Sequence, residues 1–309
     1  PVGEKKRKSN MPGRTIKIFL VDGESTGIIT AEIINWTGKF IVAPRNLLAK
    51  LGSRDEVNST GIYILVGQNI KDPTQEIIYI GQSENIWNRL KQHNADNNRD
   101  FWTKTIVIVS RDENLTSTHV RYLEKRLIEI ARQSKRAKVI NQTITENIPL
   151  PEPDISDMEY FLEQILLMLP VLGFSFAIPL PNTNENFALD IPVFTLNYAG
   201  ASAIAQEING EFVVFQGSTA RKAHTKSLAR SYIQIRERMK QEGKLVNSSD
   251  PNFWEFAENV PFQSPSTAAT IITGTSLNGR KHWKVRGTNK SYADWQSEQI
   301  NTIQGGLAE

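Results

Sequence analysis

The basic residues of this 309-residue chain are confined to two blocks. Residues 139–220 contain no lysine or arginine but ten acidic residues, which gives this stretch a formal charge of −10. The preceding residues 1–138 carry a charge of +8, and residues 221–309 carry +5. This partition predicts two basic units around an acidic one, and the length suits about two domains of roughly 150 residues.

The charge pattern bears on partners. A basic unit attracts polyanions, whereas an acidic segment repels them within the roughly 8–10 Å over which charges act in physiological salt. Nucleic acid is therefore the leading class of partner, and RNA is a less suitable one because the sequence contains no RNA-recognition motif. Composition alone leaves one alternative open, namely a solvated surface on which the charges cluster by chance.

Several classes of protein are excluded. Cysteine is absent, which rules out disulfides, thiolate zinc sites and cysteine nucleophiles, so a metal ion would need Asp, Glu, His, Asn or water as ligands. The most apolar stretch, Ile165–Leu180, is too short for a membrane span and is interrupted by Pro170 and Gly173. We therefore expect buried core there, no secretory leader, no membrane contact and a cytoplasmic location.

Proline and strand patterns predict the domain boundaries. Short β-rich runs such as IKIFLV and KFIVA indicate a small sheet within residues 1–52, after a basic arm at residues 1–10 that need not be native. Three prolines between Asn147 and Asp154 predict a stiff linker. The expected units are residues 1–52, a domain at 53–145, a linker at 146–155, and a C-terminal domain at 156–309, acidic over 156–220 and basic over 221–309.

Residues 61–141 carry the most informative pattern. The runs GIYILV at 61–66 and IIYI at 77–80 are rich in β-branched and aromatic residues and predict a hairpin, and TIVIV at 105–109 predicts a third strand. Ser83 is expected to cap a short helix, and a second helix is expected from about Thr116 to Gln133. On the first helix Arg89 and His93 are four residues apart, so their side chains project together.

The second predicted helix holds a carboxylate in an unusual place. Glu124 falls within the apolar stripe of this helix, and a carboxylate that points into a core has to be neutralised, paired or bound to a metal. Periodicity leaves a plainer alternative, in which Glu124 lies at the helix edge or pairs with Arg121 or Arg89. Tyr63 and Tyr79 could likewise be ordinary strand aromatics.

Five elements taken in order resemble the motifs of the GIY-YIG nuclease family: Gly61-Ile62-Tyr63, Tyr79-Ile80-Gly81, Arg89, Glu124 and Asn141. The resemblance covers about residues 58–145. It implies an α+β fold in which a small three-stranded antiparallel sheet is flanked by helices. It also implies a divalent-metal-dependent endonuclease that acts on DNA.

The resemblance implies a role for each catalytic residue. Glu124 would hold a single Mg²⁺, or Mn²⁺, against the leaving oxygen, and Arg89 would stabilise the phosphoryl charge. Tyr63 would position or deprotonate the attacking water, with Tyr79 in the same hydrogen-bond network, while Asn141 would brace the site. His93 resembles a residue of restriction-type members that could assist proton transfer. Gln82 departs from the pattern, because a lysine is common at that position.

The C-terminal part carries a second resemblance. FQSPSTAATIITGTSLNGRKHWKV at residues 262–285 resembles the RAMA-like module associated with restriction systems, which implies recognition of DNA and of its modification state. Basic groups near an aromatic suit phosphate contacts with base stacking, although Trp283 could equally be structural. A basic segment at 219–244 adds a surface that could follow the DNA backbone. The expected DNA-binding residues are Arg221, Lys222, Lys226, Arg230, Lys281, Trp283, Lys284 and Arg286.

The sequence therefore predicts a modular α+β protein that cuts DNA in a metal-dependent reaction, in a genome-defence or restriction setting. Two alternatives stay open: a DNA-binding or scaffold protein without catalysis, and a structure-specific nuclease of repair or recombination. A monomer with one such site would nick DNA and a dimer could cut both strands, but the sequence does not reveal the oligomeric state.

Overall fold

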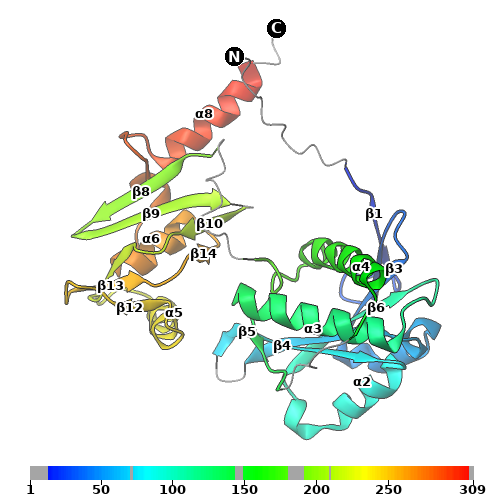
Figure 1. Cartoon of the computed structure of the whole chain (residues 1–309). Helices are drawn as coiled ribbons and strands as arrows, with labels where there is room; N and C mark the ends of the chain where they lie inside the picture. Colours follow the sequence, from blue (N-terminus) through cyan, green and yellow to red (C-terminus); the bar gives the residue numbers. More distant parts are fainter. Residues whose placement is uncertain (1–12, 70–71, 143–148, 180–190, 209, 306–309) are drawn as a thin grey trace. The chain divides into compact units, whose positions relative to one another are not determined.

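The computed structural model describes residues 13–69, 72–142, 149–179, 191–208 and 210–305 (Figure 1). The chain forms two compact units that divide after Pro179. The predicted basic arm at residues 1–10 lies outside the described residues, as do residues 146–148 of the predicted linker. The two units are α+β, as the sequence predicts.

The first unit is built on one seven-stranded sheet with the order β1-β2-β3-β6-β4-β5-β7. All neighbours are antiparallel except β5 and β7. The strands are β1 (Ile16–Leu20), β2 (Ile29–Ile33), β3 (Gly38–Pro44), β4 (Gly61–Asn69), β5 (Asp72–Ser83), β6 (Trp102–Ser110) and β7 (Lys138–Val139). The three expected strands are present as β4, β5 and β6, but the sheet is larger than three strands because β3 pairs with β6 along its whole length.

Helices cover both faces of this sheet (Figure 1). Along β4 the side chains alternate, so that Ile62, Ile64 and Val66 face one core while Tyr63 and Leu65 face the other. The first core lies under α3 (Ser117–Ser134) and α4 (Glu152–Val171). The second lies under α1 (Leu48–Gly52) and α2 (Ile86–Ala95), with the short 3-10 turns η1 (Arg45–Leu47), η2 (Asp55–Asn58) and η3 (Asn97–Arg99) beside them.

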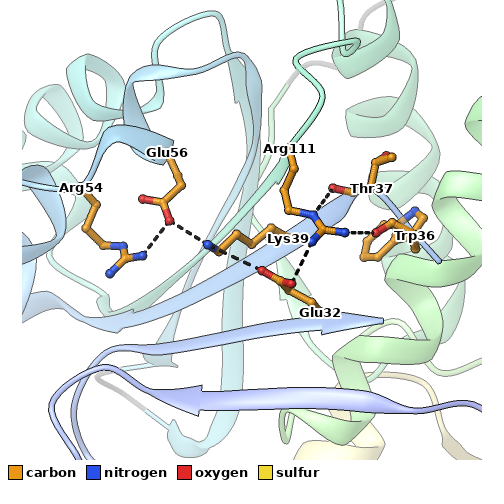
Figure 2. A network of polar contacts seen from close by, with 7 residues as sticks. All are labelled: Glu32, Trp36, Thr37, Lys39, Arg54, Glu56 and Arg111. Carbon is orange, nitrogen blue, oxygen red and sulfur yellow. Dashed lines mark hydrogen bonds and ion pairs between the residues drawn. The ribbon is translucent and has the colours of Figure 1, made fainter. Parts of the chain in front are cut away.

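Polar contacts also join the N-terminal strands to the rest of the sheet (Figure 2). Glu56 of η2 accepts hydrogen bonds from Lys39 of β3 at 2.9 Å and from Arg54 at 2.6 Å. Lys39 also pairs with Glu32 of β2, and Glu32 pairs in turn with Arg111 at 3.1 Å. The described residues 13–52 therefore do not form a separate segment, since their strands and charges are part of the same sheet and its polar network.

The domain boundary also differs from the predicted one. The predicted linker at 146–155 leads directly into α4, which begins after Pro151 and packs Phe161, Leu162 and Ile165 into the core it shares with α3. Glu159 of this helix pairs with Arg126 of α3 at 2.7 Å. Proline suits the first turn of a helix, where its missing N–H has no partner to lose, so these prolines start an element instead of separating two domains.

The apolar stretch within Ile165–Leu180 is core, as expected: Ile165, Phe174 and Phe176 are all buried in the same cluster, while Leu180 itself lies outside the described residues. Among the described helices, none has the length and apolar character that crossing a membrane requires.

The second unit combines two sheets with helices. A five-stranded sheet has the order β14-β10-β9-β8-β15, and a three-stranded sheet has the order β11-β13-β12. Their strands are β8 (Val193–Tyr198), β9 (Ala201–Ile208), β10 (Glu211–Val214), β11 (Thr219–Arg221), β12 (Leu245–Asn247), β13 (Phe253–Phe256), β14 (Val260–Phe262) and β15 (Lys284–Val285). The helices are α5 (Arg230–Gln241), α6 (Pro265–Thr273), α7 (Gly279–His282) and α8 (Tyr292–Gly305).

Candidate active site

A glycine on β5 makes room for the central tyrosine of the site. Tyr63 is only 1% exposed, and it lies opposite Gly81 in the β4–β5 register. A Cβ atom at position 81 would lie 2.2 Å from the Tyr63 hydroxyl and 2.3 Å from its ring carbon Cζ. Since such distances are far inside van der Waals contact, the phenol can cross β5 only where residue 81 has no side chain.

Helix α2 supplies two partners for this hydroxyl. Its N-cap is Asn85, whose side chain accepts from the Asn88 N–H at 2.9 Å, so the expected cap, Ser83, lies two residues too early. Arg89 and His93 project together as their spacing predicts. Arg89 Nε lies 3.3 Å from the Tyr63 hydroxyl, and His93 Nε2 lies 2.8 Å from it.

Tyr79 completes the aromatic part of the site. Its ring centroid lies 6.2 Å from that of Tyr63 and 5.1 Å from that of His93. Its hydroxyl shares hydrogen bonds with Tyr63 and with Arg89. The guanidinium of Arg99, in η3, stacks over the Tyr79 ring at 4.5 Å from the centroid.

Burial sets the protonation states of this group. Burial raises the pKa of Tyr63, and the nearby Tyr79 adds to the increase, so that the phenol keeps its proton at neutral pH. Burial also lowers the pKa of His93 to about 4, with help from the positive charges of Arg99 and Arg89. The imidazole is therefore neutral at physiological pH.

The edge of β5 that pairs with β7 also brings Asn141 and Glu124 to the site. Backbone groups of every second strand residue point to the same edge, which makes Ile78, Ile80 and Gln82 successive positions here. Ile78 accepts from the Ile140 N–H at 3.0 Å. The Asn141 side chain then accepts from the Ile80 N–H at 3.1 Å and donates to its carbonyl at 2.6 Å.

Glu124 takes the next position along this edge, because its carboxylate accepts a hydrogen bond from the Gln82 N–H. The contact uses the backbone of residue 82, which does not depend on whether the side chain is glutamine or lysine. Asn141 is 8% exposed and acts as a clamp that continues the strand pairing up to the site. The carbonyl of Asn141 in turn accepts from Arg132 at 2.6 Å.

Glu124 is a carboxylate in an unfavourable place. Helix α3, which is capped by Thr116, holds Glu124 half-buried beside Arg89 and Arg121. Burial raises its pKa to about 7, because the two arginines and the Gln82 N–H offset only part of the desolvation. Among the residues that the structure describes, none forms an ion pair with it within 4 Å.

The donor set suits a hard divalent cation that keeps most of its own water. In the described parts of the chain, no three acidic or histidine side chains cluster as a complete metal cage. Mg²⁺ is often held by one or two carboxylates with water and phosphate oxygens completing the shell. A partly desolvated carboxylate without an ion-pair partner fits that requirement, so Glu124 is the residue that could hold such an ion.

The structure changes part of the expected C-terminal surface. Trp283 is completely buried and donates from Nε1 to the carbonyl of Pro265 at 3.0 Å, so it is a core residue and cannot stack on a base. Arg236, which belongs to the basic segment 219–244, is 1% exposed and stacks on Trp254 at 4.9 Å. Lys240 and Lys244 pair with acidic neighbours on or just after α5.

The other expected DNA-binding residues keep access to solvent. Lys226, Arg230, Lys281 and Arg286 are exposed, and Arg221, Lys222 and Lys284 are partly exposed. Arg221 and Lys222 also line a cavity of about 440 Å³ together with Phe253 and Asn252. The buried guanidinium of Arg236 donates to the backbone carbonyl of Arg221 from behind.

Two contributors escaped the sequence interpretation. Arg99 lies six residues beyond His93 in the short 3-10 turn η3, and nothing in its spacing indicates that it returns to the site. In the sequence Gly81 is only the last residue of a motif. The structure shows that its missing side chain leaves the space that the Tyr63 ring occupies. An arginine shortly after a helix that contains a histidine is the one available signal in the sequence, and it is a weak one.

Comparison with known families agrees with this geometry. The family model described as the GIY-YIG catalytic domain matches residues 59–137. A model described as a domain of unknown function (DUF4357) matches residues 194–296, which confirms a distinct C-terminal module. That description assigns no function, so the RAMA-like resemblance stays a prediction. Searches of curated proteins and of solved structures gave no match.

All of the converging side chains except Asn141 lie within the first match. The match, the Tyr63–Gly81 packing and the meeting of Arg89 with Glu124 agree with one another. Residues 59–137 of this chain are thus a GIY-YIG catalytic domain, the catalytic unit of a family of nucleases.

Proposed function

We propose that this protein is a divalent-metal-dependent endonuclease that hydrolyses phosphodiester bonds in DNA. The main support is the meeting of Arg89, Tyr63 and a desolvated Glu124 at one edge of β5. This arrangement joins a permanent cation, a hydrogen-bonding hydroxyl and a cation ligand around one accessible position. Such a combination suits charge stabilisation on a phosphoryl group.

Each group has a task in that reaction. Arg89 is exposed at the site and is held in place by Tyr63 and by Gln92 at 2.8 Å, so its charged fork can bind phosphoryl oxygens. The Tyr63 hydroxyl holds Arg89 in place, and the half-buried Tyr79 would orient the attacking water through its own hydroxyl. Glu124 would hold Mg²⁺ or Mn²⁺, which supplies positive charge for the leaving oxygen.

The C-terminal module is proposed to hold the DNA. Lys226, Arg230, Lys281 and Arg286 are exposed cations, and Arg221 and Lys222 present positive charge at the 440 Å³ cavity beside the Phe253 ring. Phosphate contacts of this kind position a protein without reading sequence, and they make affinity fall steeply with salt. DNA affinity that is insensitive to salt between 50 and 200 mM, roughly the range over which such contacts weaken, would contradict this part of the proposal.

The biological setting is proposed from module association alone. A nuclease domain joined to a second domain with exposed cations fits a cutter with a DNA-holding partner, as genome-defence enzymes require. Cytoplasmic location and action on DNA in restriction belong to the same proposal.

The test compares Glu124→Gln with the wild type on supercoiled plasmid, methylated and unmethylated, in Mg²⁺, Mn²⁺ or EDTA. Glu129→Gln is the matched control, because it makes the same change on the same helix at a residue that pairs with Arg126. We expect metal-dependent nicked or linear product from the wild type and the control, and none from Glu124→Gln. Cleavage in EDTA, or by Glu124→Gln at the wild-type rate, would contradict the proposal.

If the protein binds the plasmid but leaves it intact, the result would favour a DNA-binding protein without catalysis or a nuclease that needs a structured substrate. A panel of branched and flapped duplexes then separates these two, because only a structure-specific nuclease would cut them. A difference between the methylated and unmethylated plasmids would support a reading role for the C-terminal module.

A further inference from the structure

Arg99 contacts the active site although no motif includes it. Its Nη1 lies 3.0 Å from Nδ1 of His93, and its guanidinium covers the Tyr79 ring. An ion pair with Asp96 at 3.3 Å holds the arginine near the end of α2. One residue therefore contacts both the imidazole and one of the two site tyrosines.

The contact with Nδ1 determines where the histidine proton lies. A guanidinium can only donate, so His93 Nδ1 must accept and carry no proton. The ring is neutral, since burial and the two arginines lower the pKa of His93 to about 4. A neutral imidazole carries one proton, which then lies on Nε2, the nitrogen 2.8 Å from the Tyr63 hydroxyl.

The direction of the remaining hydrogen bonds follows from this assignment. His93 donates from Nε2 to the Tyr63 oxygen, and Arg89 donates to the same oxygen from Nε at 3.3 Å. With both lone pairs engaged, Tyr63 directs its own proton away, and its hydrogen bond with Tyr79 raises the pKa of Tyr63, as expected when Tyr63 is the donor. The chain of donors thus runs from Arg99 through His93 and Tyr63 to Tyr79.

We propose that Arg99 is a positioning residue that fixes His93 as a hydrogen-bond donor to Tyr63, and that His93 therefore does not accept a proton from Tyr63. The inference deepens the proposed nuclease function and rests on it only for its catalytic consequence. A donor to the phenol oxygen favours the phenolate over the phenol, so the arrangement assists Tyr63 in taking up negative charge.

The charged and titratable groups that face His93 belong to four elements. Tyr63 comes from β4, Tyr79 from β5, Arg89 from α2 itself, and Arg99 from η3, with Asp96 at the end of α2. Asp96 raises the pKa of His93, but it does so less than the two arginines lower it. Removing Arg99 should therefore release Nδ1 and also move the His93 titration toward its ordinary range.

The first experiment determines the protonation of the imidazole by nitrogen-15 NMR of the full chain labelled at its four histidines. The signals of His93 are assigned as those that disappear in His93→Gln. The wild type is expected to show a neutral His93 protonated at Nε2 from pH 6 to 8, a window set to about the range in which histidine titrates. Arg99→Met should populate the Nδ1–H tautomer and raise the pH at which the ring gains its second proton. Arg99→Lys should restore the wild-type tautomer in part.

The matched control is Lys91→Met, which removes a cation from α2, the helix that carries His93, at a residue whose amino group lies over the Trp87 ring. It should leave the His93 signals unchanged. An Nδ1–H tautomer in the wild type, or an Arg99→Met spectrum identical to the wild type, overturns the proposal. Thermal unfolding identifies a variant that fails to fold, and Arg99→Lys then carries the test.

The second experiment measures cleavage by the same variants. Removal of an outer partner of a site residue commonly lowers activity about 10- to 100-fold. Arg99→Met should lower kcat by about tenfold with an unchanged KM, and Arg99→Lys should recover part of the loss. A wild-type rate in Arg99→Met would overturn the positioning role. A wild type that cleaves nothing would instead contradict the nuclease proposal, while the NMR result would still decide the tautomer.

Discussion

Two glutamates of the first unit have opposite electrostatic surroundings. Glu56 lies in the polar network of Figure 2, where hydrogen bonds from Lys39 and Arg54 outweigh the effect of burial and lower its pKa to about 2. Glu124 lies at the edge of β5, where burial outweighs its neighbours and raises its pKa to about 7. Glu56 thus forms ion pairs with Lys39 and Arg54, whereas among the described residues no cation forms an ion pair with Glu124.

The difference separates charges that hold the sheet together from charges that are kept for a ligand. The Glu56 network joins β2, β3, η2 and the residue after β6, so its ion pairs connect the N-terminal strands to the rest of the unit. The ionised form of Glu124 is unfavourable without a bound cation, because burial removes it from water. Carboxylates whose pKa is shifted in this way are frequent at functional sites. The comparison therefore predicts opposite effects for the same glutamate-to-glutamine change.

The largest expected effect is on activity. Glu124→Gln should lower the rate of plasmid cleavage by about a thousandfold, within the range seen when a key electrostatic group is removed. Glu56→Gln should leave the rate within about twofold, because ion pairs of such a network act on stability and not on the reacting phosphate. Single-turnover cleavage at saturating Mg²⁺ measures both.

A loss of cleavage in Glu56→Gln with a normally folded protein would break the comparison. It would mean that the N-terminal strands position the site as well as supporting the sheet. Lys39→Met would then be expected to show the same loss, since it removes the same contact from the other side.

A smaller effect is expected on stability. Glu56→Gln should lower the free energy of unfolding by about 1 kcal/mol at pH 7, because the network is partly exposed and solvent screening limits each ion pair. Glu124→Gln should leave the free energy of unfolding unchanged or raise it, since it removes a desolvated charge. Denaturant titration of each variant gives both values, and a destabilised Glu124→Gln would show that Glu124 has a structural partner.

Much of the first unit was predictable from local pattern. The β-branched runs at 61–66, 77–80 and 105–109 lie in strands β4, β5 and β6, and the helix expected from about Thr116 to Gln133 is α3. The approach of Arg89 and His93 followed from helical spacing. These features depend on residues that are close in sequence or on one regular periodicity.

The parts that could not be predicted depend on contacts distant in sequence. Nothing in KFIVA indicates that β3 pairs with β6 some 70 residues later, and the prolines before α4 look the same whether they precede a linker or start a helix. The basic neighbours of Trp283 favour a DNA-binding role, whereas the fold buries its ring completely. Arg99 reaches His93 only through the path of a loop.

The smallest expected effect is the pH dependence of stability. The pKa of Glu56 in the folded protein lies below its ordinary value, so its contribution is present above about pH 4.5 and is lost as the pH falls toward 2. The pKa of Glu124 lies above its ordinary value, so wild-type stability declines as the pH rises from about 4.5 through 7. Relative to the wild type, Glu124→Gln should therefore gain roughly 2 kcal/mol between about pH 5 and 8, because each unit of the pKa shift corresponds to about 1.4 kcal/mol. Glu56→Gln should keep a constant deficit over that range.

Unfolding curves in EDTA at pH 5, 6, 7 and 8, spaced about one unit apart to cover the titration of a raised carboxyl pKa, test this contrast without any assay of cleavage. Mg²⁺ should cancel the wild-type decline at high pH, because a cation that binds ionised Glu124 in the folded state stabilises that state. Identical pH slopes for the wild type and Glu124→Gln would mean that solvent reaches the carboxylate freely. Glu124 would then lose its distinction from Glu56, and a metal site at the edge of β5 would need another ligand.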